Sequence, residues 1–185
     1  MTNKQLNHKH HQSSHTKYPV CLLAHNIDLP GNVGSLFRIA DALGVERIFL
    51  SGTSPVPPND KIKRTSRSTE KYVPYDYEEK PLELIKRLKS AGYTIISLEI
   101  TSSSMDIRDL SLSRNEKTCL ILGSESEGVC QSLLDVSDKT IHIPMQGKNS
   151  SMNIVTACTI AVFDITRNYN LQTKVVQFKN SPMDL

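Results

Sequence analysis

The sequence predicts an α/β fold in which a mainly parallel sheet is flanked by helices. Apolar segments of strand length alternate with amphipathic segments of helix length along the 185 residues, which is typical of βαβ units. The strand-like segments are apolar on both faces, as expected for strands covered by helices on both sides. Polar glycine segments follow three of these strands, and in such folds ligands bind beyond the carboxyl ends of the strands. The sequence therefore predicts a binding site at one edge of the sheet.

The first two predicted strands, 18–26 and 46–52, enclose a predicted helix. Pro30 and Gly31 would make the turn into this helix, and Asn32 is a good N-cap. Apolar side chains then recur at helical spacing up to Gly44, which would end the helix.

The segment 53–75 contains prolines followed by a dense basic cluster, and we expect an exposed loop there. The second half of the chain is expected to alternate again: a helix over 77–93 ending near Gly92, a strand over 93–100, a strand and glycine turn over 117–129, a short helix over 129–136, a strand over 139–145 and a long helix over 151–168.

One domain is expected over 18–168, between a disordered, polar, His-rich tail (1–17) and a C-terminal tail (169–185). Metal capture by the clustered histidines of the first tail is a less favoured alternative. In the folded part no His, Cys, Asp or Glu cluster has metal-ligand spacing, so we expect no metal.

The composition favours a cytoplasmic protein without a membrane segment. No apolar run is long enough to span a bilayer, and the first residues lack the apolar core of a secretory signal. Cys21, Cys119, Cys130 and Cys158 show no CxxC pairing, which favours buried thiols in a reducing compartment. The net charge of +3 is too small to prove a nucleic-acid partner.

Each polar segment has a plain structural interpretation when taken alone. In "NIDLPGNVGSLFR" Asn32 could be a cap and Arg38 a surface charge; "GSESEGV" could be an ordinary turn; "IPMQGKNSSMN" could lead into a core helix capped by Ser150 or Ser151. A dinucleotide fingerprint, a Walker phosphate loop and a GxSxG nucleophile motif are all absent from the sequence.

Three motifs nevertheless follow one another: Asn32-Val33-Gly34 with Arg38 and Ala40-Asp41-Ala42-Leu43-Gly44; an apolar strand with Gly123-x-Glu125-x-x-Gly128; and Ile143-Pro144-Met145-x-Gly147 with Ser151-Met152-Asn153. In this order they resemble the motifs of the SpoU (TrmH-like) family of the SPOUT superfamily of RNA methyltransferases. The resemblance spans roughly residues 18–168. Met152 is a departure, because Leu is commoner there.

The resemblance implies a SPOUT fold, in which the C-terminal helix is threaded through a loop to make a deep trefoil knot. It implies S-adenosyl-L-methionine as cofactor, bound in the knot, and a homodimer with the active site at the subunit interface. The cofactor-binding positions that it implies are Leu98, Glu99, Leu122, Gly123, Ile143, Met145, Gly147, Ser151 and Met152.

The reaction implied by the resemblance is methyl transfer to a ribose 2′-hydroxyl of RNA, with Arg38 as the central catalytic residue and Asn32, Glu125, Ser151 and Asn153 around it. A guanidinium is a poor general base. We therefore expect Arg38 to bind the adjacent phosphate and to stabilise developing alkoxide charge. Glu125 would orient Arg38 or Asn32 rather than act as a base.

Beside such a site, a basic cluster becomes a candidate phosphate-binding strip, made of Lys61, Lys63, Arg64, Arg67 and Lys71. No aromatic residues are interleaved to stack on single-stranded bases, which favours recognition of backbone and shape. We expect tRNA as substrate in preference to rRNA. The alternatives are an rRNA methyltransferase and a non-catalytic RNA-binding relative.

Overall fold

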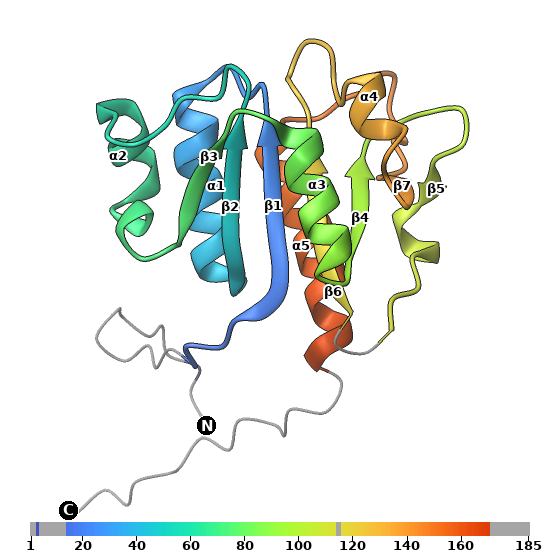
Figure 1. Ribbon diagram of the computed structural model, residues 1–185, viewed down its shortest axis with the longest axis horizontal. Helices are drawn as coiled ribbons and strands as arrows, with labels where there is room; N and C mark the ends of the chain where they lie inside the picture. Colours follow the sequence, from blue (N-terminus) through green and yellow to red (C-terminus); the bar gives the residue numbers. More distant parts are fainter. Residues whose placement is uncertain (1–2, 4–13, 114–115, 171–185) are drawn as a thin grey trace, which may run out of the picture.

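The structure of the chain is a computed structural model, which describes residue 3 and residues 14–113 and 116–170 (Figure 1). One sheet of parallel strands runs through it, in the order β3-β2-β1-β6-β4-β7-β5. The strands are β1 (Tyr18–His25), β2 (Val45–Ser51), β3 (Tyr75–Glu78), β4 (Tyr93–Leu98), β5 (Met105–Asp106), β6 (Lys117–Leu122) and β7 (Lys139–His142). The prediction of a mainly parallel sheet is confirmed.

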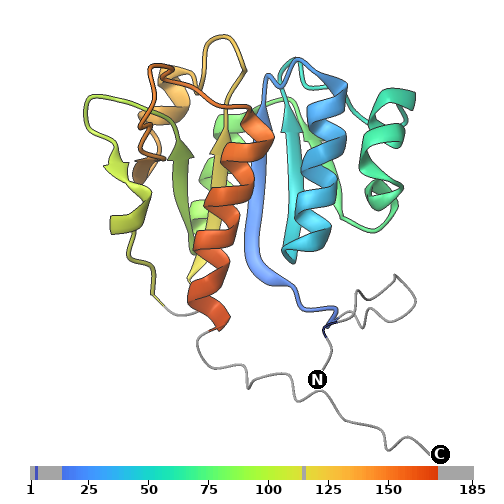
Figure 2. The same cartoon turned by 180° about the vertical axis from the view of Figure 1, so that it is seen from behind.

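Helices cover both faces of this sheet (Figures 1 and 2). The helices are α1 (Pro30–Ala42), α2 (Asp60–Ser66), α3 (Pro81–Ser90), α4 (Gln131–Leu134) and α5 (Ile154–Asn170), with short 3-10 turns at Thr69–Lys71 and Ile107–Asp109. Helices α1 and α5 lie side by side on one face, with α2 packed on the outer side of α1, and α3 and α4 lie on the opposite face.

The two apolar cores follow from the alternation of side chains along the strands. In β1, Val20, Leu22 and Ala24 are buried in the core beneath α1 and α5. Their neighbours Cys21 and Leu23 are buried in the core beneath α3 and α4. The strands are apolar on both faces because helices cover both faces of the sheet.

The carboxyl ends of the central strands meet at one edge. Residue Ala24 of β1 pairs with Leu122 of β6, and Leu98 of β4 pairs with Ile141 of β7. The segments that follow these strands therefore emerge together, as the sequence predicts. The threaded path of the trefoil knot stays a prediction of the family resemblance.

The expectation of an exposed loop over 53–75 is wrong, because this segment contains α2, a 3-10 turn and the start of β3. Asn59 caps α2 by accepting hydrogen bonds from the amides of Lys61 (2.9 Å) and Ile62 (3.3 Å). Ile62 is fully buried. One buried apolar side chain in so short a helix produces too little periodicity to be recognised in the sequence.

The caps of the two long central helices also differ from expectation. Helix α1 begins at Pro30, so that Asn32 lies inside the first turn and does not cap it. In α5 the cap is Asn153, not Ser150 or Ser151: its Oδ1 accepts from the amide of Val155 at 2.9 Å. Helix α5 continues to Asn170, past the expected boundary at 168; the rest of the two predicted tails lies largely outside the described residues.

The cysteines are free thiols, and three of them, Cys21, Cys119 and Cys158, are buried as expected, whereas Cys130 is half-buried. Burial raises the pKa of the Cys158 thiol to about 12. Among the described residues, no helix has the length and apolar character that a membrane span requires.

Candidate functional site

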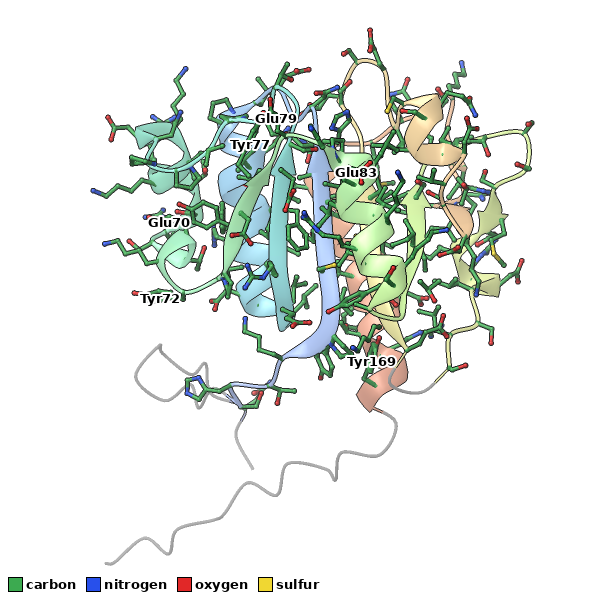
Figure 3. All side chains as sticks on the ribbon, viewed as in Figure 1. Glu70, Tyr72, Tyr77, Glu79, Glu83 and Tyr169 are labelled. Carbon is green, nitrogen blue, oxygen red and sulfur yellow. The ribbon has the colours of Figure 1, made fainter. Side chains whose placement is uncertain are left out.

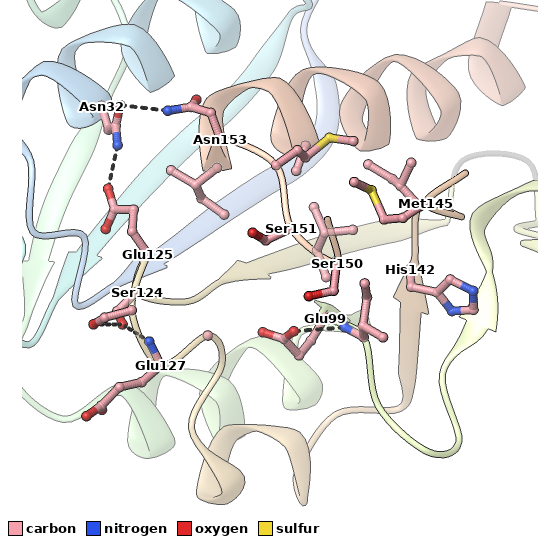
Figure 4. A pocket seen from close by; sticks show the side chains of 18 of the residues that line it. Asn32, Glu99, Ser124, Glu125, Glu127, His142, Met145, Ser150, Ser151 and Asn153 are labelled. Atoms are coloured by element: carbon pink, nitrogen blue, oxygen red, sulfur yellow. Dashed lines mark hydrogen bonds between the residues drawn. The ribbon is translucent and has the colours of Figure 1, made fainter. Parts of the chain in front are cut away.

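A pocket of about 690 Å³ lies beyond the carboxyl ends of β4, β6 and β7 (Figure 4). All three polar segments contribute to it, and a fourth wall comes from the residues that follow β4. The side chains and backbone that line it belong to Leu29, Asn32, Leu98, Glu99, Ile100, Ser124, Glu125, Ser126, Glu127, Gly128, His142, Ile143, Met145, Ser150, Ser151, Met152, Asn153, Ile154 and Ala157.

A chain of hydrogen bonds joins one residue of each motif at the rim of the pocket (Figure 4). The Glu125 carboxylate accepts from Nδ2 of Asn32 and, through its other oxygen, from the amide of Asp28 at 3.1 Å. Oδ1 of Asn32 accepts from Nδ2 of Asn153 at 3.5 Å. Asn32 is free for this role because it does not cap α1. The three motifs, far apart in the sequence, thus form one polar cluster.

The second motif forms a tight loop whose glycines are required by close approach. The backbones of Ser124 and Gly128 exchange two hydrogen bonds of 3.0 Å. A Cβ on Gly123 would lie 2.1 Å from the carbonyl carbon of Gly128, so a side chain at Gly123 would force this loop open. Gly128 itself has φ of +70°, a region that favours glycine.

The third motif passes over the opposite side of the pocket. Ile143 and Met145 follow β7 and line the wall, and Ser151 and Met152 line it just before α5 begins. Gly147 does not line the pocket; it is exposed, and a Cβ on it would meet open space. The predicted cofactor-binding residues Leu122 and Gly123 also lie outside the lining, with Leu122 fully buried beneath it.

The charge of the pocket has one sign. Glu99, Glu125 and Glu127 line it, while neither Lys nor Arg occurs among the lining residues that the structure describes. A wall of this charge attracts a cation and repels phosphate. His142 is held at the edge by a hydrogen bond of 3.0 Å between its Nδ1 and Oγ of Ser104.

Arg38 is not part of this pocket. It lies six residues after Asn32 on α1, roughly 9 Å farther along the helix axis, and its side chain is exposed. Its guanidinium makes no hydrogen bond or ion pair with the residues that the structure describes. Within one copy of the chain, Arg38 therefore points to solvent rather than to the other predicted catalytic residues.

The predicted RNA-binding side chains all lie on α2 and the turn that follows it, and all are exposed: Lys61, Lys63, Arg64, Arg67 and Lys71. Figure 3 shows their acidic neighbour Glu70 on the same flank, where its carboxylate accepts from the Ser66 hydroxyl. Within the described ranges none of the five forms an ion pair, so their charge is available to a partner.

Gly34, the glycine of the first motif, connects this basic flank to the pocket. A Cβ at Gly34 would lie 2.0 Å from Oγ1 of Thr65 and 2.5 Å from the carbonyl oxygen of Ile62, both on α2. The glycine therefore permits close packing of α1 against α2. One turn of α1 thus presents Asn32 to the pocket and Gly34 to the basic helix.

Several lining residues were not predicted from the sequence as site residues. Ser124, Ser126, Glu127 and Ser150 lie inside the motif segments, and their polarity there was a usable signal. Leu29, Ile100, Ile154 and Ala157 are apolar and carry no such signal, and His142 looked isolated in the sequence. The pairing of β4 with β7 brings Ile100 and His142, which follow and end these strands, to the same edge of the sheet.

Comparison with known proteins identifies the family of the chain. A tRNA (guanosine(18)-2′-O)-methyltransferase, TARBP1 of Mus musculus, is 30% identical over 149 residues, which are 79% of this chain and 9% of that protein. An uncharacterised tRNA/rRNA methyltransferase of Borreliella burgdorferi is 30% identical over 150 residues, 81% of this chain and 64% of that protein. The chain thus spans less than two thirds of the length of these relatives.

A solved structure shares the fold. The SpoU methyltransferase AviRb from Streptomyces viridochromogenes, in complex with the cofactor AdoMet, superposes with a TM-score of 0.72 at 25% identity, over 82% of this chain and 58% of that one. The model of the SpoU rRNA methylase family matches residues 19–163, which include all three motifs and most of the described structure. The chain therefore belongs to the SpoU rRNA methylase family.

Proposed function

We propose that this protein transfers a methyl group from S-adenosyl-L-methionine to a ribose 2′-hydroxyl of RNA, with tRNA preferred over rRNA. The observation that carries the proposal is the pocket, in which Asn32, Glu125 and Asn153 from three separate motifs form one hydrogen-bonded cluster. The Mus musculus and Borreliella relatives support it, because both are named as methyltransferases of tRNA or of tRNA and rRNA.

The pocket fits this cofactor in size and charge. Its volume of about 690 Å³ falls in the range of roughly 300–1,000 Å³ typical of small-molecule sites. Leu98, Ile143 and Met145 offer an apolar wall to an adenine ring, and the carboxylates suit a molecule that carries a sulfonium. When bound, the cofactor supplies a methyl group on a leaving group that is already activated.

Glu125 is a positioning group in this proposal, not a general base. Both of its oxygens already accept hydrogen bonds, one from Asn32 and one from the amide of Asp28. Asn32 is held between Glu125 and Asn153, so that the amides of the rim have fixed directions. Ser151 is exposed beside them and is free to contact the incoming ribose.

The position of Arg38 supports a homodimer with a shared site. Helix α5 exposes Ile160 (39%) and Phe163 (62%) on the same side of the sheet as α1, which carries Arg38 (Figure 2). We propose that a second copy covers these apolar side chains and that Arg38 then lies against the pocket of its partner. There the guanidinium would bind the RNA phosphate and stabilise developing alkoxide charge, and the proton would leave to a phosphate oxygen or to water.

RNA would approach over the basic flank. The pocket wall is acidic and repels phosphate, whereas α2 and its following turn present five exposed cations. This separation of charge keeps the polyanion out of the cofactor pocket and on the surface beside it. A preference for tRNA is proposed over rRNA, which is the alternative substrate; a non-catalytic RNA-binding protein is the other alternative.

A methyl-transfer assay tests the proposal. Total tRNA and total rRNA from a strain lacking the protein are incubated with labelled S-adenosyl-L-methionine, and the digested RNA is analysed by mass spectrometry. We expect a 2′-O-methylnucleoside from the tRNA pool, and none with Arg38→Ala, which should still bind the cofactor. Product from rRNA alone would favour the alternative substrate. RNA binding without transfer to either pool would favour the non-catalytic alternative.

A further inference from the structure

Glu99 occupies an unusual place between the sheet and the second motif. It follows β4 directly, and its amide donates to the carbonyl of Ile141 in β7 at 2.9 Å. Its side chain lies along the wall of the pocket, below Ser150 in the view of Figure 4 and beside the glycine loop of the second motif. It is half-buried, which is a costly position for a carboxylate unless it is hydrogen-bonded.

Two backbone amides satisfy this carboxylate. Oε1 accepts from the amide of Ile100 at 2.8 Å, and Oε2 accepts from the amide of Val129 at 2.9 Å. Hydrogen bonds to an ionised acceptor are roughly twice as strong as neutral ones. The second bond crosses 30 residues of sequence, and it joins the end of β4 to the base of the loop formed by residues 124–128.

The contact with Gly128 makes the fit specific. A Cβ at Gly128 would lie 2.1 Å from Oε2 of Glu99, so only glycine leaves room for the carboxylate. Two features therefore require glycine at position 128: its positive φ and the closeness of the Glu99 side chain. The glycine loop and the Glu99 carboxylate are thus complementary in shape.

The same loop carries Glu125, which holds Asn32 and the amide of Asp28 at the rim. The two backbone hydrogen bonds between Ser124 and Gly128 close the loop. A shift of the loop base at Val129 therefore also moves the arm of the loop that carries Ser124 and Glu125. We propose that Glu99 is a positioning residue: by holding the base of this loop it fixes Glu125, and through Glu125 the polar cluster of the site. This inference rests on the methyl transfer proposed above.

Amide hydrogen exchange in the protein alone tests the structural half of the proposal. Glu99→Gln keeps the shape of the side chain but has only one acceptor oxygen. We expect exchange at Val129 to become about tenfold faster. The decisive position is Asp28, whose amide is bonded by Glu125 and not by Glu99, and which should also exchange about tenfold faster. Unchanged exchange at Asp28 would overturn the proposal.

The control is Glu79→Gln, the same chemical change at an exposed residue after β3 (labelled in Figure 3). In the sheet β3 is separated from β4 by β2, β1 and β6. This variant should leave exchange at both amides within about twofold of the wild type. A general loss of stability in Glu99→Gln would be recognised by faster exchange throughout the core strands as well.

A double-mutant cycle tests the functional half. Glu99→Gln should slow single-turnover methyl transfer about tenfold in the wild type but less than about twofold when Glu125 is already replaced by Gln, because the two residues act in series. An equal loss in both backgrounds would contradict this and indicate direct contact of Glu99 with the cofactor. If the wild-type protein transfers no methyl group, the proposed function fails, while the exchange rates at Asp28 still decide the role of Glu99.

Discussion

At the scale of single residues, Asn153 shows how one side chain serves the fold and the site together. Its Oδ1 caps α5 through the amide of Val155 (2.9 Å), and its Nδ2 donates to Asn32 (3.5 Å). The motif pointed to Asn153 as a site residue, whereas the cap was expected at a neighbouring serine. A short polar residue before an apolar helix signals a cap, but the sequence does not show which of several such residues turns inward.

Asn153→Asp separates these two roles. Aspartate is as good a cap as asparagine, so the free energy of unfolding should stay within about 0.5 kcal/mol of the wild type. The new carboxylate has no proton to donate to Asn32 and lies near Glu125, so the methyl-transfer rate should fall at least tenfold.

Urea unfolding and single-turnover rates measure the two effects. Asn153→Ala is the matched variant, because it removes cap and donor together and should cost about 1 kcal/mol of stability as well. A fully active Asn153→Asp protein would refute the donor role.

At the scale of elements, α1 and α2 pack against each other but differ in how much of each helix is buried. Helix α1 was predicted from its apolar periodicity, and its long buried face explains that success. Helix α2 was missed because only Ile62 and Ser66 are buried. The short strands β3 and β5 were missed because pairing with one neighbour, not an apolar run, defines them. Gly34 was recognised as part of a motif, but its reason, close contact with α2, requires the structure.

Gly34→Ala should disturb this contact. The added methyl would meet the backbone carbonyl of Ile62, which cannot move without α2. We expect a loss of about 1–3 kcal/mol in the free energy of unfolding, the usual cost of overpacking. Gly147→Ala is the control for stability, since its Cβ meets open space, and it should change stability by less than about 0.5 kcal/mol. Equal unfolding midpoints for the two variants in urea would show that α1 and α2 are less tightly packed than described.

At the scale of the whole molecule, charge and apolar surface are distributed on separate regions. The pocket is acidic, the flank formed by α2 is basic, and α5 exposes Ile160 and Phe163. The composition, with a net charge of +3, gave no sign of this separation. A parallel sheet could be predicted from the sequence, and with it the meeting of the three motifs at one sheet edge. The position of Arg38 outside the pocket could not be predicted in this way.

The basic flank predicts a salt-dependent affinity for RNA. Replacing Lys63, Arg64 and Arg67 by Ala should weaken binding and flatten the plot of log affinity against log salt, by roughly 0.7–0.9 for each phosphate that the variant no longer neutralises. Lys86 and Lys89 of α3 serve as controls, because they lie on the other face of the sheet. An unchanged slope in the triple variant, measured by filter binding over a salt series, would mean that this flank does not bind RNA.

The exposed face of α5 predicts a dimer. Phe163→Glu replaces an apolar side chain that is 62% exposed in one copy by a charged one. A second copy that buries this position should then no longer bind. Light scattering should then report twice the chain mass for the wild type and the chain mass for the variant, with the monomeric variant inactive in methyl transfer. A wild-type protein that is monomeric at micromolar concentration would contradict a shared site.

We propose that the three motifs form a single cofactor site. This proposal is tested most directly by hydrogen exchange measured with and without saturating S-adenosyl-L-methionine. The pocket predicts simultaneous protection of the segments 29–32, 124–128 and 143–153, one from each motif, because residues of all three line one volume. Cofactor binding that protects other parts of the chain and leaves these three segments unchanged, or no binding at all, would contradict a single cofactor site formed by the three motifs.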